Sequence, residues 1–138
     1  MVGDERKAEA VDAAARLLRY GDRSRAELES RLTSRGIEPD ALAEALDTLE
    51  RVGALNDSKT AILRATALAD RGYGDMWIRA ELERRSLPFE GALAALEPER
   101  DRAGRIVAVR GGGAATARYL ARRGFDEDTL ERAFADDG

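Results

Sequence analysis

The chain has 138 residues, a formal net charge of −4, 43% hydrophobic residues, and neither cysteine nor histidine. This length suits one domain or a short run of structural repeats. The two missing residue types exclude disulfide bonds, thiolate metal sites and the commonest general base. We therefore expect a protein with no catalytic residues, no cofactor and no metal.

The N-terminal segment, residues 1–20, carries charged side chains throughout and has no uninterrupted apolar run. Signal peptides and membrane-spanning helices both require such a run. We therefore expect a cytoplasmic protein that has no membrane segment.

The first part of the chain predicts three helices. An opening helix covers roughly residues 7–20. The pattern "SRAE" from Ser24 to Glu27 is a capping box, so a second helix begins there. Gly36 follows the second helix and Gly53 follows the third. We expect each glycine to end its helix in a left-handed conformation. Apolar residues of the third helix recur at spacings of three and four, as on one buried face; they are Leu42, Ala45, Leu46, Leu49 and Val52.

The rest of the chain is also helical by its pattern, with further opening helices near residues 57–71 and 99–110. No alternation of β-branched residues reaches the length of a strand, which predicts an all-α protein. Proline can occupy the first position of a helix, as we expect for Pro39, Pro88 and Pro98. The run Gly111–Gly113 predicts a loop or hinge, because glycine costs about 1 kcal/mol in a helix interior.

The sequence repeats itself at shifts of 50 and 88 residues. The first shift places Leu28 on Ile78 and Leu32 on Leu82, and the second places Leu32 on Leu120. Three three-helix repeats are predicted, over residues 1–56, 57–97 and 98–138, the last with an acidic C-terminal tail. A unit this small cannot bury its apolar face alone and needs its neighbours. We therefore predict an elongated, curved array of three repeats.

Four segments in this order resemble the RecX family, the bacterial regulators of the RecA recombinase. They are "RSRAELESRLTSRGI" (23–37), "LERVGALND" (49–57), "RGYGDMWIRAELERRSL" (71–87) and "YLARRGF" (119–125). The resemblance covers roughly residues 15–134. Its specificity lies in the order of three unequal repeats, since a single "ELxxRLxxRG" is compatible with any helical hairpin.

This resemblance implies a non-catalytic regulator that binds along the groove of the RecA filament on single-stranded DNA. It also implies modulation, usually inhibition, of the ATPase, recombinase and coprotease activities of RecA, with the ATP belonging to the partner. RecA and single-stranded DNA would be the partners of a monomer. The chain departs from the family where Thr60 replaces an aromatic residue, and where Ser86 and Leu87 replace Gly and Ile.

Charge is distributed unevenly along the last third of the chain. Residues 100–125 contain seven arginines and one acid, a net charge of +6, whereas residues 126–138 carry a net charge of −5. Because the basic block has almost no acids nearby in the sequence, we expect it to bind an anionic partner. The acidic tail could fold over this block and compete with DNA.

The residues chosen as a partner or DNA surface lie mostly in the basic block, with additions from the middle repeat. They are Arg84, Arg85, Arg105, Arg110, Arg118, Arg122, Arg123 and Trp77. Arginines at helix C-termini also complement the helix dipole, which is the purely structural alternative. Trp77 aligns with Glu27, so we expect its ring to be partly exposed, either packed on a neighbouring repeat or as an anchor in an interface.

Other functions remain open on the sequence alone. Three short helices with a glycine turn also describe a helix-turn-helix module that binds specific DNA sequences. The repetition of basic residues in three copies favours the array over that alternative. Paired carboxylates occur at Glu81 and Glu83 and at Glu97 and Glu99. We expect them to be solvated, because nothing places them in a cleft.

Overall fold

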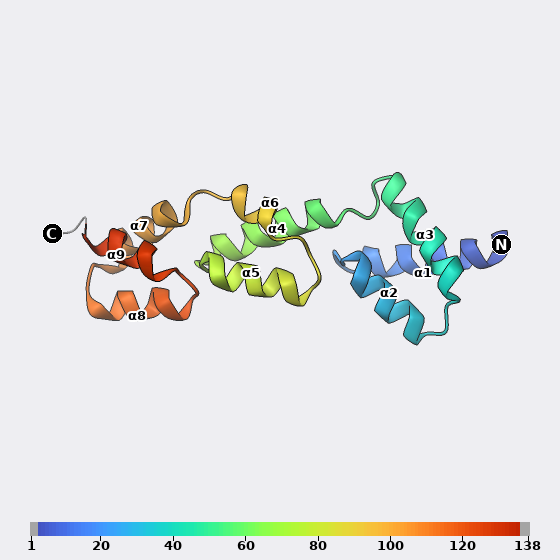
Figure 1. Ribbon diagram of the computed structural model, residues 1–138, viewed down its shortest axis with the longest axis horizontal. Coiled ribbons are helices and arrows are strands. Elements are labelled where there is room, and N and C mark those ends of the chain that lie inside the picture. The colour runs from blue at the N-terminus through green and yellow to red at the C-terminus, as the bar shows by residue number, and fades with distance from the viewer. Residues whose placement is uncertain (1–2, 136–138) are drawn as a thin grey trace. The chain divides into compact units, whose positions relative to one another are not determined.

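The computed structural model describes residues 3–135, which form nine α-helices and contain no strand (Figure 1). This confirms the predicted all-α class. The helices are α1 (Asp4–Arg19), α2 (Arg25–Ser34), α3 (Pro39–Arg51), α4 (Asp57–Asp70), α5 (Asp75–Arg84), α6 (Glu90–Ala94), α7 (Glu99–Arg110), α8 (Ala114–Arg122) and α9 (Glu127–Ala135).

The helices follow one another as three groups of three, and equivalent apolar positions are buried in each group. The side chains that the sequence shifts superimpose are all inaccessible to solvent; they are Leu28, Leu32, Ile78, Leu82 and Leu120. The third helix of the middle group, α6, has only five residues. The repeat is therefore confirmed, whereas its bounds at residues 56 and 97 and the curvature of the array stay predictions.

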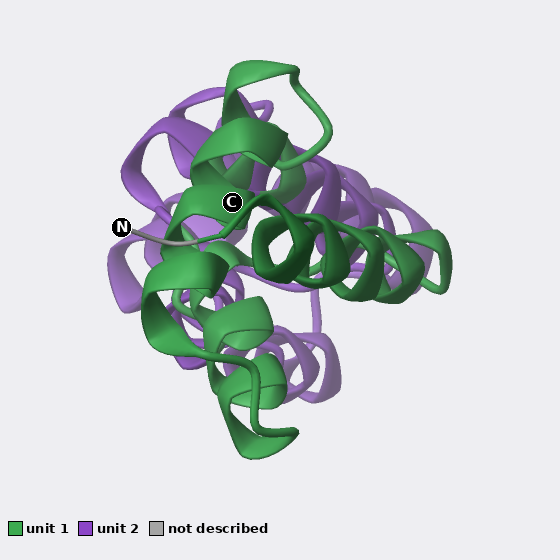
Figure 2. Cartoon of the chain, turned by 90° about the vertical axis from the view of Figure 1, so that its right-hand side faces the viewer, with its two compact units in different colours: residues 1–60, 85–87 green, residues 61–84, 88–138 purple. Residues whose placement is uncertain are grey.

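Packing divides the chain into two compact units (Figure 2). Unit 1 comprises residues 1–60 and 85–87. Its core consists mainly of leucines from α1, α2, α3 and the segment that follows α3; they are Leu17, Leu28, Leu32, Leu42, Leu46, Leu49 and Leu55. Small residues let α1 and α3 approach closely, with Ala10 against Ala41 and Ala45. Each buried leucine contributes about 1.5–3 kcal/mol to stability.

Charged side chains also hold unit 1 together. Arg25, at the start of α2, donates to Asp47 at 2.8 Å and to Glu29 at 3.1 Å, and it also pairs with Glu50. The hydrogen bond to Asp47 is the main reason that the pKa of Arg25 is raised. Asp47 lies on α3, so this arginine links α2 to α3.

Unit 2 comprises residues 61–84 and 88–138. One of its apolar clusters joins α7, α8 and α9; its buried members are Ala103, Val107, Leu120, Phe125 and Ala133. Ile78 and Leu82 are fully buried on α5, and Ala65 and Leu68 are buried on α4. All residues of the candidate site described below, apart from one, belong to this unit.

Most of the predicted helix boundaries are confirmed. The Ser24 hydroxyl accepts a hydrogen bond from the Glu27 N–H at 3.1 Å, and Glu27 accepts one from the Ser24 N–H at 2.8 Å, which completes the capping box. Gly36 and Gly53 have φ values of +86° and +81°, as left-handed helix ends require. Ser86 occupies the position equivalent to Gly36 and is also left-handed, with φ +57°.

The three prolines differ in their positions. Pro39 begins α3, as predicted. Pro98 is instead the N-cap of α7, because its ψ of 138° is extended, and Pro88 lies two residues before α6. The prediction that each proline begins a helix is therefore wrong for these two.

The glycine run forms a loop. Gly111 ends α7 with φ +94°, and Gly113 is the N-cap of α8. This confirms the predicted loop, while its role as a hinge stays a prediction. Of the acidic tail, residues 136–138 lie outside the described part of the chain, and α9 contains most of the rest.

Candidate interaction surface

The N-terminal turn of α5 is capped by the backbone that follows α8. The N–H of Gly74 donates to the carbonyl of Arg123 at 2.8 Å, and the N–H of Met76 donates to the carbonyl of Gly124 at 3.1 Å. The first N–H groups of a helix have no partner within the helix. The third repeat therefore supplies partners for two such groups of the second repeat.

This capping requires glycine on both sides. A Cβ atom on Gly74 would lie 2.5 Å from the backbone of Gly124, and one on Gly124 would lie 2.6 Å from the Trp77 backbone N. Gly124 also has φ +87°, a conformation that only glycine adopts readily. The two backbones are therefore in direct contact, and this contact fixes where Trp77 lies.

Glu99 caps two helices at once. One oxygen of its carboxylate accepts from the N–H of Asp75 at the start of α5, and the other accepts from the N–H of Asp126 at 3.0 Å, just before α9. A carboxylate is favourable at a helix N-terminus because of the helix dipole. The prediction that Glu99 is merely solvated is therefore wrong, since its partners lie 24 and 27 residues away.

Arg102 is a structural residue, although its sequence context groups it with the exposed arginines of the basic block. Its side chain is 6% exposed and donates to the carbonyls of Tyr73 at 3.0 Å and Glu97 at 2.9 Å, and it pairs with Asp75. Burial raises the pKa of Asp75, and the positive charge of Arg102 partly offsets this rise. The sequence offered only one signal for this residue, its place in the basic block.

Arg123 lies between the second and third repeats of unit 2. Its guanidinium donates to the carbonyl of Gly72 at 3.1 Å and to that of Arg71. The same group lies over the ring of Tyr73, 4.0 Å from the centroid, and 5.1 Å from that of Tyr119. Arg123 is therefore half-buried and engaged by residues of its own chain.

Rings and guanidinium groups continue on both sides of Arg123. Arg110 lies over the ring of Tyr119 at 3.7 Å, and the ring of Tyr73 stacks on that of Trp77, with centroids 4.8 Å apart. We name this series, Arg110, Tyr119, Arg123, Tyr73 and Trp77, the cation–aromatic stripe. Trp77 lies at the end of the stripe and is 45% exposed, which confirms the partial exposure predicted for this residue.

The face of α5 that bears Trp77 continues to an acid held by two arginines. Glu81 follows Trp77 by four residues and so lies on the same face. Arg84 contacts Glu81 at 2.8 Å and Arg64 contacts it at 3.4 Å. The hydrogen bond from Arg84 is the main cause that lowers the pKa of Glu81. Glu81 is thus not a solvated carboxylate, contrary to the prediction.

Arg105 forms an ion pair with an acid that lies outside the basic block. Its guanidinium binds the carboxylate of Glu97 in a bidentate manner, with one contact at 2.6 Å. This pairing raises the pKa of Arg105. A hollow of about 620 Å³ lies beside it, lined by residues of α4 and α7 and by Tyr119. The prediction that the basic block has almost no acids to pair with is therefore wrong for Arg102 and Arg105, whose partners come from the second repeat.

Arg118 and Arg122 differ from these arginines. Both are exposed on α8, four residues apart on one helix face, and no carboxylate within residues 3–135 pairs with either. The equivalent positions of the first repeat are Ser30 and Ser34. These two cations are thus a feature of the third repeat that the repeat pattern does not require.

Arg85 lies apart from the other candidates, in unit 1. It donates to the carbonyl of Asp22 at 2.7 Å and to Glu27 at 3.1 Å, and its side chain is 17% exposed. Burial alone would raise the pKa of Glu27, but hydrogen bonds from Ser24 and Arg85 outweigh burial and lower it. Arg85 therefore has a structural partner, and its choice as a partner contact stays a prediction.

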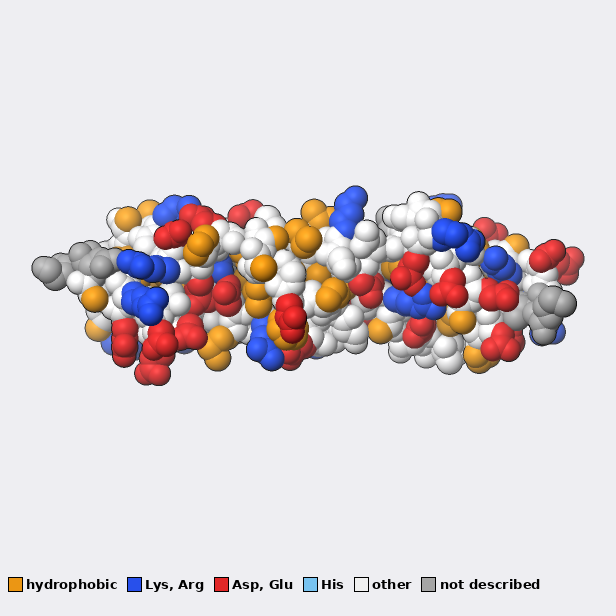
Figure 3. Space-filling view, turned by 45° about the horizontal axis from the view of Figure 1, so that its top comes forward, with side chains coloured by type: hydrophobic (Ala, Val, Ile, Leu, Met, Phe, Trp, Pro, Cys, Tyr) orange, Lys and Arg blue, Asp and Glu red, His pale blue; other side chains and the backbone are white. Residues whose placement is uncertain are grey.

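The structure thus brings together only part of the chosen set. Trp77, Arg110 and Arg123 belong to the stripe, and Arg84 lies on the same face of α5 as Trp77. Basic and acidic side chains are interspersed on the face drawn in Figure 3, in agreement with ion pairs such as those of Arg84, Arg102 and Arg105. Among the arginines of the set, Arg110, Arg118 and Arg122 are exposed and lack an acidic partner among the described residues, and Arg110 lies instead over the ring of Tyr119.

Comparisons with known proteins give a consistent result. A family model described as "RecX, first three-helix domain" matches residues 10–49. The regulatory protein RecX of Chromohalobacter salexigens is 39% identical over 139 aligned residues, which cover 90% of each chain. That of Xanthomonas oryzae pv. oryzae is 36% identical and covers 89% of this chain and 85% of its own.

Solved structures are similar in fold. The crystal structure of RecX from Lactobacillus salivarius matches with a TM-score of 0.78 at 18% identity, over 96% of both chains. A second crystal structure of a regulatory protein RecX has a TM-score of 0.76 at 15% identity, over 96% of this chain and 74% of the other. At these identities the match supports the fold alone.

The described residues contain neither a membrane-spanning helix nor a carboxylate cluster suited to a metal ion. None of the helices between residues 3 and 135 combines the length and the apolar composition that crossing a membrane requires. The same part of the chain contains no cluster of three or more acidic residues arranged to hold a metal ion.

Proposed function

The chain belongs to the RecX family of regulatory proteins, and from this membership we propose that it binds the RecA filament on single-stranded DNA. Binding inhibits the ATPase, recombinase and coprotease activities of RecA. The protein acts in the cytoplasm as a monomer. Identity of 35–39% to several regulatory RecX proteins, over most of the chain, supports this proposal.

The regulation is non-catalytic, and the recombinase hydrolyses the ATP. The carboxylates with shifted pKa values support this part of the proposal. Glu27 and Asp57 accept hydrogen bonds from the N-terminal turn of α2, and Asp75 and Glu81 pair with arginines. These partners, which come from the chain itself, give each carboxylate a structural role.

The single observation on which the surface rests is the pair Arg118 and Arg122. An exposed arginine without an acidic neighbour keeps its full charge available to an anionic partner. Two such residues at a spacing of four project from the same face of α8. Repeated along a filament, one such contact gains by multivalency.

The test is ATP hydrolysis by a RecA filament on single-stranded DNA, titrated with this protein. We expect the native chain to inhibit hydrolysis and the double variant Arg118→Ala/Arg122→Ala to require at least about tenfold more protein, since two charge-assisted contacts of about 1 kcal/mol each are lost. Inhibition that is equal for both proteins would move the surface away from α8. No effect of the native chain in excess would contradict the regulator itself.

The matched control is Arg31→Ala/Arg35→Ala. These two arginines are also exposed and four residues apart, in the last turn and at the C-cap of the middle helix of the first repeat. We expect this variant to inhibit as the native chain does. A loss as large as that of the α8 variant would mean that total charge, and not the third repeat, determines binding.

A further inference from the structure

The cation–aromatic stripe ends in an exposed tryptophan. Each guanidinium of the stripe lies within 3.7–5.1 Å of a ring centroid, the distance range of cation–π contacts. One face of the Trp77 ring is covered by Tyr73. Since Trp77 is still 45% exposed, its ring offers a flat surface to a ligand.

The stripe holds this ring in place before any ligand binds. Trp77 contacts Gly124 through its backbone, and Tyr73 is fixed by Arg123, which in turn donates to two carbonyls before α5. A ring that is already ordered loses little conformational entropy on binding. An exposed aromatic residue on a flexible loop would not have this advantage.

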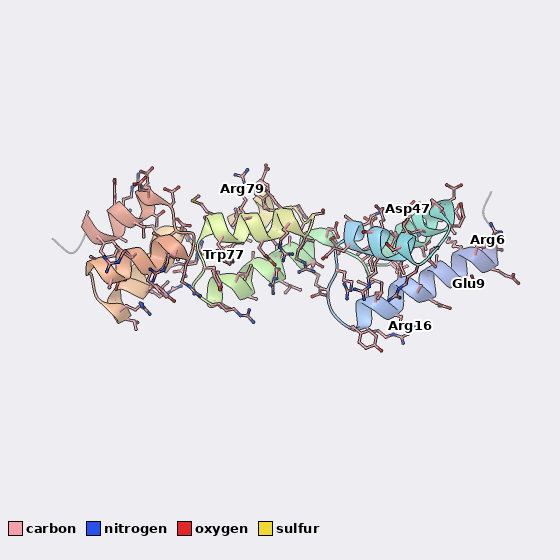
Figure 4. The ribbon with its side chains drawn as sticks, turned by 90° about the horizontal axis from the view of Figure 1, so that it is seen from below. Arg6, Glu9, Arg16, Asp47, Trp77 and Arg79 are labelled. Atoms are coloured by element: carbon pink, nitrogen blue, oxygen red, sulfur yellow. The ribbon has the colours of Figure 1, made fainter. Side chains whose placement is uncertain are left out.

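The charge around Trp77 favours an anion. Glu81, the next acid along this face of α5, is held by Arg64 and Arg84, and Arg84 remains 70% exposed. Figure 4 shows Trp77 and Arg79 projecting on opposite sides of α5. Arg79 is directed to Phe89 and Glu83 instead. The face of Trp77 thus presents a ring next to exposed cations.

We propose that Trp77 stacks on an unpaired base of a single-stranded nucleic acid, while Arg84 and the exposed arginines of α8 contact its phosphates. Every base has a π-face, so a stacking platform beside cations binds single strands without strong sequence preference. A duplex cannot bind in this way, because its bases are already stacked. This inference rests on the proposed function and deepens it, since it makes the single strand a direct ligand of this chain.

The experiment uses the full chain without any recombinase. Trp77 is the only tryptophan, so its fluorescence reports contact with a base directly. We expect an oligothymidylate of about 15 nucleotides, near the upper end of such site sizes, to quench this fluorescence. An abasic strand of equal length and charge should bind at least about fivefold more weakly and leave the fluorescence nearly unchanged.

Variants separate stacking from general charge. With a dye-labelled oligothymidylate, Trp77→Ala should weaken binding about tenfold, whereas Trp77→Phe, which retains a ring, should keep most of the affinity. The control is Tyr20→Ala, because Tyr20 is an aromatic residue that is 82% exposed in unit 1. Its removal should leave binding unchanged.

Several outcomes would overturn the proposal. They are equal affinity for the abasic strand, saturation of binding without quenching, equal loss in the Tyr20 variant, tighter binding of duplex, or no binding of either strand. None of these binding outcomes changes the expected result of the ATPase titration, because inhibition can still arise from contacts with the recombinase protein. Failure of this inference is therefore distinguishable from failure of the proposed function.

Discussion

Two places in the chain perform the same task with different residues. In unit 1, Arg85 follows α5 and donates to the carbonyl of Asp22 before α2. In unit 2, Arg123 follows α8 and donates to the carbonyl of Gly72 before α5. We call these the first and second junctions. Their four residues are equivalent under the sequence shifts, so one mode of contact occurs twice.

A carboxylate completes each junction. The N–H of Arg25, in the first turn of α2, donates to Asp57 at 2.9 Å, and the N–H of Asp75, in the first turn of α5, donates to Glu99. Asp57 and Glu99 are the first residues of α4 and α7. The opening helix of one repeat therefore caps the middle helix of the repeat before it.

The junctions differ in how the remaining N–H groups are satisfied. In the first, α2 caps itself through Ser24 and Glu27, and Glu27 also binds Arg85. In the second, Gly74 has no side chain, so the neighbouring backbone caps α5 directly. Position 77, equivalent to Glu27, is then free to be tryptophan. Capping by a neighbour has thus released a surface position from a structural role.

The largest test of this comparison is Gly124→Ala in the second junction. We expect a loss of about 3 kcal/mol in the free energy of unfolding for two reasons. Alanine would have to adopt φ +87°, which is strained for a residue with a side chain, and its Cβ would overlap the backbone of Trp77. Urea denaturation measures it. The control is Gly36→Ala, which has φ +86° and nothing within 4 Å, so that it should lose only about 1–2 kcal/mol. Equal losses would mean that the close backbone contact is absent.

A test of intermediate size is Glu27→Gln in the first junction. Because the fold lowers the pKa of Glu27 from its ordinary 4.5, its ionised form contributes stability above that pH, and this contribution is lost as the pH falls through the lowered value. The variant should be about 1 kcal/mol less stable at neutral pH and should lose less stability on acidification. Urea midpoints between neutral and acid pH measure both effects.

The second junction should respond to pH in the opposite sense. Burial raises the pKa of Asp75 above its ordinary 3.8, so stability falls as the pH rises from that value through the raised pKa. Asp75→Asn should remove this fall. A parallel pH dependence of the Glu27 and Asp75 variants would contradict the assignment of the two carboxylates to different environments.

The smallest expected effect is a gain from Ser86→Gly. Ser86 is the described non-glycine residue with positive φ, at +57°, and glycine adopts this conformation without steric cost. We expect about 0.5–1 kcal/mol of added stability, seen as a higher urea midpoint. Ser30→Gly, inside α2, should instead lose about 0.5 kcal/mol. A loss at both positions would show that the Ser86 side chain contributes contacts that offset its strain.

Features that depend on neighbouring residues could be predicted from the sequence. The capping box at Ser24, the left-handed glycines and the buried leucines all follow from contacts three to five residues apart, which the sequence displays directly. The helix starts predicted at Pro98 and Pro88 are wrong by one and two residues, because the backbone conformation before a helix decides where it begins.

Partners of charged side chains could not be predicted in this way. The basic block suggested seven similar arginines, yet Arg102 is buried, Arg105 is paired with Glu97, and Arg123 binds carbonyls 51 and 52 residues away. Glu99 caps two helices, whereas its sequence context predicts a solvated acid. The sequence by itself thus determined the helices, their repetition and their buried faces, because these depend on the helical period. Only the tertiary structure decided which charges remain available, because that depends on which distant segments come into contact.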